Sequence, residues 1–456
     1  MSAPASRVSG MTDLRAAVEA VLPSVRTDLE RLVRIPSISA DPAHAGDVRA
    51  SAEAVAELAR GAGAARADVV GVDGGAPAVI ASWPAPDGAP TVLLYAHHDV
   101  QPTGPADQWS SGPFEPSERD GRLYGRGVSD DKAGVAMHLA ALRAYGGRPP
   151  VGVVLFVEGE EEIGSPTFTT FLQTYRDRLA ADVIVVADSA NWTPETPALT
   201  TSLRGLADCT VTVRVLEHAV HSGVFGGPVL DALTSLCRLL ATLHDEKGDV
   251  AVAGLVTDPA ADVEYPEERY RGEAAVLDGV ELSGTGPLAD RLWSRPAISV
   301  LAIDAPAVAD AANILIHRAS AKVSLRLAAS QDPQAGLEAL TNHLRGHADF
   351  GVQVEVTDGA VGGGCVLPTS GPVFEAAEAA LTEAFGVQSV RAGMGGSIPF
   401  IAEFQEAFPD ATVLATGAGD PDTRAHGLDE SLHLDMFAKG CLAEALLLDR
   451  LARLPR

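Results

Sequence analysis

The sequence predicts an α/β protein: a large domain with a mostly parallel sheet and flanking helices, interrupted by a smaller α+β domain. Strands alternate with helices in 1–204 and again in 366–456, which is typical of a parallel sheet with helices on its faces. The strands expected in 205–365 instead alternate apolar and polar residues, as in a sheet with one exposed face. We therefore expect 1–204 and 366–456 to form the large domain, with an inserted domain at 205–365.

The first part of the large domain carries the clearest periodicity. Apolar residues recur at helical spacing over 11–35, where Pro23 is expected to kink or divide the helix. The next expected elements, in chain order, are helix 48–63, strands 78–83 and 91–96, helix 133–145, strand 151–157, helix 166–179 and strand 183–187. The last of these is an uninterrupted apolar run, typical of a strand buried on both faces.

The rest of the chain is more polar at first and then returns to the earlier pattern. In the inserted domain we expect strand 208–215, helix 228–244, a polar stretch at 258–290 rich in glycine, proline and glutamate, and strands 321–327 and 352–356. The last segment is expected to contain helix 373–385, strand 411–415 and helix 433–452. This return of the strand–helix alternation assigns the two outer segments to one domain.

Composition disfavours several classes of function. The 456 residues are 46% hydrophobic and 21% charged, which is typical of a globular chain. The formal net charge of −27 disfavours binding to nucleic acids or anionic membranes, since both need a basic surface. The four cysteines are far apart and are expected to be reduced, buried thiols of a cytoplasmic protein. Neither a signal peptide nor a membrane-spanning segment is expected.

Polar residues follow several of the expected strands, and ligands bind at such strand ends in open α/β sheets. His97 and Asp99 follow the strand at 91–96, and residues i and i+2 of an extended chain share a face. The two side chains can therefore converge, with the imidazole on a metal and the carboxylate on its other nitrogen. Asp188 ends another apolar strand. Taken alone, Asp188 is interpreted as an ordinary strand-end turn residue. The alternative for His97 is an ordinary core or surface histidine.

Two acidic segments lie in the same half of the chain. Glu160-Glu161-Glu162 follows the strand at 151–157, and three adjacent carboxylates repel one another unless a cation offsets their charge. A solvated acidic loop is the alternative interpretation of this run. The segment 125–132, Gly-Arg-Gly-Val-Ser-Asp-Asp-Lys, precedes an expected helix, and its alternative is a glycine turn with an aspartate N-cap. Its spacing does not match a phosphate-binding loop.

Two further segments carry a histidine: His426 within 425–430 and His221 within 221–227. Together with the earlier clusters they supply two histidines and three carboxylates for metals, plus a spare glutamate and a spare histidine. A two-metal hydrolase needs this set of side chains: one carboxylate bridges the two ions, and another carboxylate, which binds neither ion, activates water.

These motifs resemble those of the dinuclear zinc peptidase family that includes carnosinase-type dipeptidases, glutamate carboxypeptidase, acetylornithine deacetylase and succinyl-diaminopimelate desuccinylase. They occur in order and at suitable spacing over nearly the whole chain. The resemblance implies that His97 and Asp188 bind one metal, that Glu162 and His426 bind a second, and that Asp130 bridges both.

The resemblance also implies the catalytic groups and the cofactors. Glu161 would be the general base, and Asp99 would hold the ligand His97 from the side away from the metal. The cofactors would be two divalent metal ions, expected to be Zn²⁺, with Mn²⁺ or Co²⁺ as alternatives that suit the same ligands.

Three neighbouring features complete the expected metal site. The relatives have a cis peptide bond after the bridging aspartate, so we expect the bond Asp130–Asp131 to be cis. Glu160 is expected to be a bystander. His98 is interpreted as adjacent to the site and not as a ligand, because a further ligand would crowd the first metal.

By the same resemblance, the inserted domain is a lid and dimerisation domain that handles a small peptide substrate. His221 would polarise the scissile carbonyl, often in the active site of the partner subunit, so a homodimer is expected. Arg326 would bind a substrate carboxylate, which suits the guanidinium fork, although an ordinary surface arginine is the alternative. Asn313, Gly396 and Ser397 match further substrate-contacting positions.

The resulting prediction is an enzyme, a two-metal dipeptidase that cleaves the amide bond of dipeptides or small peptides with a free carboxylate. Asp188 and the runs 158–162 and 221–227 resemble the dipeptidase branch. An N-acyl amino acid deacylase, such as a deacetylase or desuccinylase, is the alternative within the family. A non-catalytic metal-binding scaffold is the alternative from another class, and it is disfavoured because neither the base nor any ligand is missing.

Overall fold

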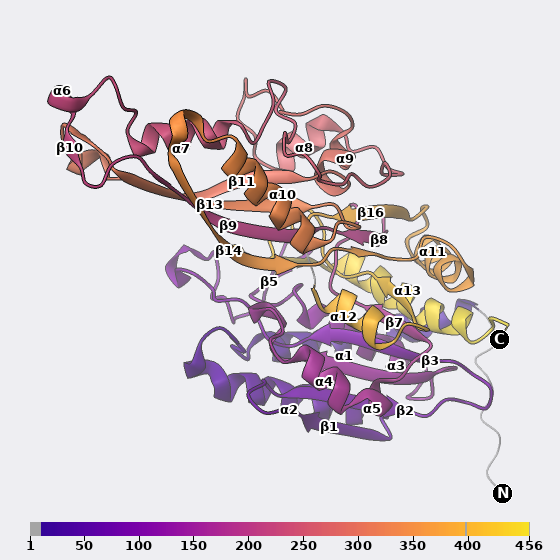
Figure 1. Cartoon of the computed structure of the whole chain (residues 1–456). Helices are drawn as coiled ribbons and strands as arrows, with labels where there is room; N and C mark the ends of the chain where they lie inside the picture. Colours follow the sequence, from indigo (N-terminus) through magenta and orange to yellow (C-terminus); the bar gives the residue numbers. More distant parts are fainter. Residues whose placement is uncertain (1–10, 397–398, 456) are drawn as a thin grey trace, which may run out of the picture. The chain divides into compact units, whose positions relative to one another are not determined.

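The computed structural model describes residues 11–396 and 399–455 of the chain, which divides into two compact units (Figure 1). Unit 1 comprises the residues up to Thr201 together with Leu367–Ala392 and Glu403–Arg456. Unit 2 comprises Ser202–Val366 and Gly393–Ala402.

The central sheet of unit 1 is parallel in its middle and antiparallel towards its edges. Its strands follow the order β1-β2-β6-β3-β7-β17-β8, in which β6, β3, β7 and β17 are parallel neighbours. They are β1 (Arg66–Val70), β2 (Ala78–Trp83), β3 (Thr91–His97), β6 (Gly152–Glu158), β7 (Val183–Val186), β8 (Ala198–Leu203) and β17 (Thr412–Ala415). Because β17 from the last segment pairs with β7 from the first, both segments build one sheet (Figure 1). The predicted α/β fold class is confirmed.

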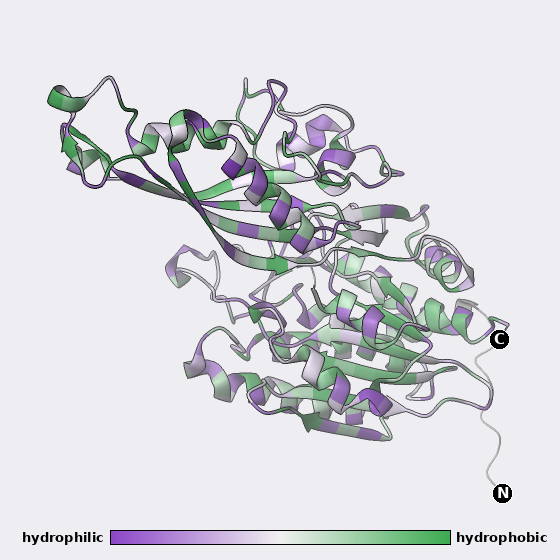
Figure 2. Ribbon diagram, viewed as in Figure 1, coloured by the Kyte–Doolittle hydropathy of each residue, from purple (hydrophilic) through white to green (hydrophobic). Residues whose placement is uncertain are grey.

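The parallel strands are buried because helices cover them and their residues are apolar. β6 is buried along its whole length, and β3 is buried from Val92 onward. Figure 2 shows mostly hydrophobic residues along these strands. Helices α1 and α13 pack on α3, α2 packs on β1 and β2, and α3 packs on β3. The helices of this unit are α1 (Met11–Val33), α2 (Ala45–Gly61), α3 (Lys132–Ala144), α4 (Phe168–Thr174), α5 (Arg176–Leu179), α11 (Pro372–Phe385) and α13 (Leu434–Leu451).

Two helices differ from their predicted outline. α1 continues through Pro23, so the helix is not divided there. Its buried residues, among them Val25 and Leu29, belong to the core of unit 1, and this packing offsets the hydrogen bond that proline removes. The helix predicted over 166–179 is interrupted at Tyr175, whose backbone is not helical and whose ring packs on Phe171.

A small antiparallel sheet in unit 1 brings distant loops together. It has the order β18-β5-β4, formed by β4 (Ser117–Arg119), β5 (Arg122–Tyr124) and β18 (Ser431–His433). Just beyond the β5–β18 pairing, the backbone N–H of Gly125 donates a hydrogen bond to the carbonyl of Glu430 at 3.0 Å. The loop after β5 therefore lies beside the loop before β18.

Unit 2 is built on an antiparallel sheet with helices packed on it. The sheet has the order β11-β13-β9-β14, and α7 and α10 pack on β9 and β13. Its elements are β9 (Gly205–Arg214), α7 (Ala232–Ala241), β11 (Ala297–Asp304), β13 (Arg318–Leu327), α10 (Pro333–Gly346) and β14 (Gln353–Gly362). Figure 2 shows both hydrophilic and hydrophobic residues along α10, as expected for a helix with one face on a sheet. The polar stretch 258–290 contains the short helix α8 (Glu267–Glu273).

No helix in the described part of the chain is long and apolar enough to cross a membrane. All four cysteines are free thiols, and Cys209, Cys365 and Cys441 are buried. The prediction that every cysteine is buried is wrong for Cys237, which lies on the exposed face of α7.

Candidate metal centre and active site

The residues expected to bind metal all lie in unit 1, on loops that follow strands. His97 ends β3, and Asp188 lies two residues beyond β7. Asp130 lies between β5 and α3, Glu162 follows β6, and His426 precedes β18. Because β3, β6 and β7 are parallel neighbours, their carboxyl ends meet at one edge of the sheet.

The side chains form two groups whose ligand atoms lie within 4.8 Å of one another. The first group is His97, Glu161 and Asp188, and the second is Asp130, Glu162 and His426. Imidazole nitrogens and carboxylate oxygens are the donors that Zn²⁺ and similar divalent ions take from proteins. The donor chemistry of both groups therefore fits a divalent metal ion.

Asp130 connects the two groups. Its Oδ1 lies 3.1 Å from Nε2 of His97, and its Oδ2 lies 3.0 Å from Nε2 of His426. The same His426 nitrogen lies 3.1 Å from Oε2 of Glu162. The peptide bond Asp130–Asp131 is cis, as predicted. The two oxygens of the Asp130 carboxylate therefore face one histidine from each group.

The electrostatics of these groups favour a cation. Burial raises the pKa of Asp188 well above its usual value, and the carboxylates of Glu161 and Asp130 add to the effect. Burial also raises the pKa of Glu161 to about 7, with Glu162 and Asp130 acting in the same direction. A bound positive ion would remove most of this mutual repulsion.

Asp99 holds two parts of the site at once. It is fully buried, and Nδ1 of His97 lies 3.1 Å from its backbone carbonyl oxygen and 3.4 Å from its Oδ1. Its carboxylate also accepts the backbone N–H groups of Glu161 and Glu162 at 3.2 and 3.1 Å. Asp99 therefore links the imidazole at the end of β3 to the loop after β6.

Glu160 is not the bystander that the sequence suggested. Its side chain is buried and accepts the backbone N–H of Ala76 at 2.9 Å. It also accepts both the backbone N–H of Thr167 at 2.8 Å and the Thr167 hydroxyl at 2.5 Å. Glu160 thus stabilises the loop that carries Glu161 and Glu162. Nothing local in the sequence signals these partners, which lie 84 and 7 residues away.

Two residues next to the expected ligands help to place them. Asp131 caps α3, and its Oδ2 accepts the backbone N–H of His97 at 3.2 Å. Gln101, which sequence reasoning missed, donates its backbone N–H to Oε1 of Glu162 at 3.0 Å and its side-chain amide to the Glu162 carbonyl at 2.9 Å. For Asp131, the only signal in the sequence was its expected position as the N-cap of a helix. Nothing in the sequence indicated a role for Gln101.

His98 belongs to neither group of ligand atoms. Its Nε2 lies 2.8 Å from the carbonyl oxygen of Pro77, an arrangement in which the ring donates that hydrogen bond. Burial lowers the pKa of His98 to about 4, so the ring is neutral at physiological pH.

The residues expected to contact substrate lie in unit 2. His221 ends β10 (Val220–His221) and is exposed, and Nδ1 of His221 accepts the backbone N–H of Gly223 at 3.0 Å. β10 pairs with β12 (Ile314–Leu315), and the Asn313 carbonyl accepts the backbone N–H of Ser222, so His221 and Asn313 lie close together. Arg326 is half-buried on β13. Gly396 is exposed, and Ser397 lies outside the described residues.

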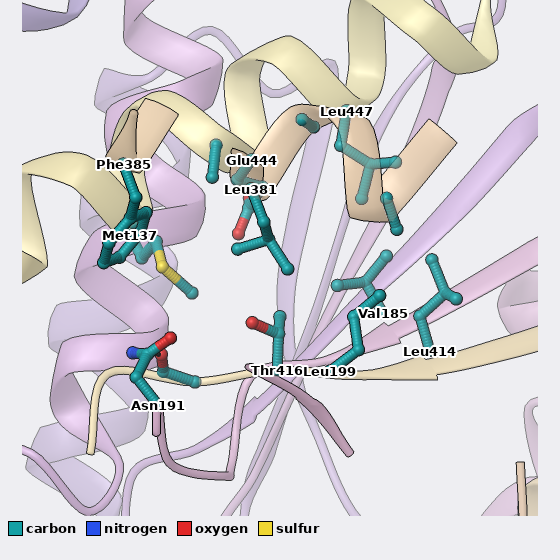
Figure 3. A pocket seen from close by; sticks show the side chains of 15 residues that line it. Met137, Val185, Asn191, Leu199, Leu381, Phe385, Leu414, Thr416, Glu444 and Leu447 are labelled. Atoms are coloured by element: carbon teal, nitrogen blue, oxygen red, sulfur yellow. Dashed lines mark hydrogen bonds between the residues drawn. The ribbon is translucent and has the colours of Figure 1, made fainter. Parts of the chain in front are cut away.

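A small apolar cavity of unit 1, with a volume of about 20 Å³, contains none of the expected site residues (Figure 3). Met137, Leu381 and Leu447 line it, and so does Glu444. The Glu444 carboxylate lies 2.8 Å from Nδ1 of the buried His138. This cavity belongs to the packed core and not to the candidate site.

The clustered imidazole and carboxylate donors at the carboxyl ends of parallel strands define a candidate site for divalent metal ions. A family model described as "Peptidase family M20/M25/M40" matches residues 93–450. The chain belongs to this peptidase family, and the resemblance stated from the sequence is confirmed.

Named relatives of the chain are dipeptidases. The chain is 37% identical to a cysteinylglycine-S-conjugate dipeptidase of Corynebacterium striatum over 78% of this chain and 80% of that protein. It is 29% identical to a Beta-Ala-His dipeptidase of Rattus norvegicus over 77% of this chain and 75% of that protein. The structure of Dug1p, a di-peptidase of Saccharomyces cerevisiae, matches this chain with a TM-score of 0.80 at 22% identity. The match covers 99% of this chain and 100% of the Dug1p chain.

Proposed function

We propose that the chain is a two-metal dipeptidase that hydrolyses the amide bond of dipeptides or small peptides with a free carboxylate. The observation that carries this proposal is Asp130, whose two carboxylate oxygens face His97 and His426 from different groups of ligand atoms. A carboxylate shared in this way is the usual bridge of a two-metal hydrolase. The names of the dipeptidase relatives support the substrate class.

In the proposed site, His97 and Asp188 would hold one ion, Glu162 and His426 would hold the other, and Asp130 would serve both. Zn²⁺ is the expected metal, and Mn²⁺ or Co²⁺ suits the same donors. When bound, such ions lower the pKa of a water molecule to about 7 and polarise a carbonyl oxygen.

Glu161 is the proposed general base. With Asp130 shared between the ions, neither site needs Glu161 as a ligand. Its side chain is 19% exposed and lies 4.0 Å from Nε2 of His97. Its carboxylate accepts the proton of the attacking water and later passes that proton to the nitrogen of the leaving amine. Proton transfer of this kind contributes about 10²- to 10⁴-fold to a rate.

Unit 2 supplies the proposed substrate contacts and acts as a lid and dimerisation domain. His221 donates a hydrogen bond to the scissile carbonyl oxygen, and Arg326 pairs with the free carboxylate of the peptide. Asn313, Gly396 and Ser397 complete the contacts. The enzyme acts as a homodimer in which His221 serves the active site of the partner subunit, and free thiols support a cytoplasmic location.

One experiment tests this function. Elemental analysis of the purified protein is combined with a dipeptide-library screen, with and without a chelator. We expect divalent metal to copurify, dipeptide hydrolysis to be lost on chelation, and activity to return with Zn²⁺, Mn²⁺ or Co²⁺. N-acetyl or N-succinyl amino acids cleaved much faster than any dipeptide would instead identify a deacylase. Bound metal without any hydrolysis would identify a scaffold.

A further inference from the structure

Glu430 is a fully buried carboxylate that accepts a converging set of hydrogen bonds. Its Oε1 accepts the backbone N–H groups of Ser129 and Asp130 at 3.0 and 3.1 Å. Its Oε2 accepts the backbone N–H of Gly127 at 2.9 Å and Nη1 of Arg126 at 2.7 Å. One side chain therefore satisfies three backbone donors of the loop that presents Asp130.

The partner of this carboxylate is buried as well. Arg126 is 1% exposed, and its Nη2 donates to the carbonyl oxygens of Pro102 and Gly427 at 3.2 and 3.0 Å. The guanidinium also lies over the ring of Trp109. Arg126 thus ties the loop of Asp130 to the residue that directly follows His426.

The two loops joined in this way carry a ligand each. Asp130 and His426 come from positions almost 300 residues apart, and their side chains meet at 3.0 Å. Glu430 lies four residues beyond His426, and the backbone N–H of Asp130 is one of its hydrogen-bond donors. The position of Asp130 relative to His426 therefore depends on the pair formed by Glu430 and Arg126.

We propose that Glu430 is a positioning residue that holds the Asp130 loop and the His426 loop in the geometry needed for metal binding. The inference rests on the proposed two-metal function, and it adds a residue that touches neither metal nor substrate. Partners of this kind affect metal affinity or activity by about 10- to 100-fold when they are removed.

The chemistry of the site makes Glu430→Gln a sharp test. Both oxygens of Glu430 face N–H donors. The amide of glutamine keeps the size of the side chain but turns one acceptor into a donor that faces other donors. The loop must then move or leave a buried donor without a partner.

Glu444→Gln is the matched control. Glu444 is also a buried glutamate of unit 1 with a buried partner, His138, and it lines the apolar cavity of Figure 3. It contacts none of the expected ligands. A general loss of stability from neutralising a buried glutamate would appear in both variants.

The metal-free forms of wild type, Glu430→Gln and Glu444→Gln are titrated with Zn²⁺ and, separately, Mn²⁺ by calorimetry, and their melting temperatures are recorded. We expect Glu430→Gln to weaken metal binding about 10- to 100-fold. At saturating metal its kcat should fall while KM for a dipeptide stays near the wild-type value. Glu444→Gln should melt at a lower temperature and bind metal as tightly as wild type.

Equal metal affinity in wild type and Glu430→Gln would overturn the inference. If Glu430→Gln does not fold, Glu430→Asp, which keeps the charge on a shorter side chain, enters the same titration, and an unchanged affinity there would overturn it too. A wild-type protein that binds neither ion would instead refute the proposed function, so the two failures are distinguishable.

Discussion

The expected metal ligands and the expected substrate contacts lie in different units, and they differ in how firmly the described structure holds them. In unit 1, His97 is fully buried and the side chain of Glu162 is 2% exposed. The side chain of His426 is 57% exposed, but its Nε2 lies 3.0 Å from Asp130 and 3.1 Å from Glu162. In unit 2, His221 and Asn313 are exposed, and α6 (Ser222–Phe225) carries Phe225 at 59% exposure. Metal chemistry needs ligands held in place before the metal arrives, whereas substrate contacts can become ordered on binding.

The largest effect is expected in unit 1, at the proposed base. Glu161→Gln removes the proton acceptor and keeps the side-chain size, so kcat should fall by about 10²-fold or more. Steady-state kinetics on a dipeptide measures this loss, with metal content per chain as the control. A variant with wild-type metal content and full activity would refute the assignment of the base.

A smaller effect is expected in unit 2, at Arg326. Arg326→Met removes a charged partner of the substrate carboxylate, and hydrogen bonds to charged groups contribute about 1.5–3 kcal/mol. We expect kcat/KM for a dipeptide to fall by about 10- to 100-fold, mainly through KM.

The matched substrate is the same dipeptide with its C-terminal carboxylate amidated. Wild type and Arg326→Met should cleave this amide equally, since it lacks the group that Arg326 binds. Equal losses with both substrates would mean that Arg326 acts on the fold and not on the carboxylate.

The exposed His221 allows a test by complementation. If His221 serves the partner subunit, a dimer of one Glu161→Gln chain and one His221→Ala chain contains one intact site. Statistical mixing would then restore activity to about one quarter of the wild-type value. Activity is measured after subunit exchange, with exchange verified by differently tagged chains. Complete exchange without recovery would show that His221 acts within its own chain.

The smallest effect concerns the core of unit 1. Burial alone would lower the pKa of His138, but Glu444 outweighs burial and raises that pKa above its usual value. The stability from this pair is fully present below the unfolded pKa of about 6.5 and is lost as pH rises through the higher folded pKa.

Melting temperatures of metal-free wild type and Glu444→Gln should therefore differ most between about pH 5 and 6, where a glutamate is ionised and a histidine is protonated, and converge as pH rises above about 6.5. The metal-free form is used so that metal binding does not contribute. A difference that grows with pH would contradict the raised pKa of His138.

Much of the fold was predictable because its signals are local. The apolar runs that became β2, β3, β7 and β17 were recognised within a residue or two of their ends. α10 was missed although Asp332 and Pro333 form a start signal for a helix. The break at Tyr175 had no signal in the periodicity, because the ring contact with Phe171 there is a matter of packing.

The sequence by itself determined the family and the order of the expected site residues from His97 to His426, since each follows a recognisable strand or motif. Only the tertiary structure decided how they are held. Asp99 reaches the loop of Glu161, and Glu430 reaches the loop of Asp130 across 300 residues. Periodicity reports only which neighbours along the chain share a face, whereas these hydrogen bonds depend on which loops the sheet brings together.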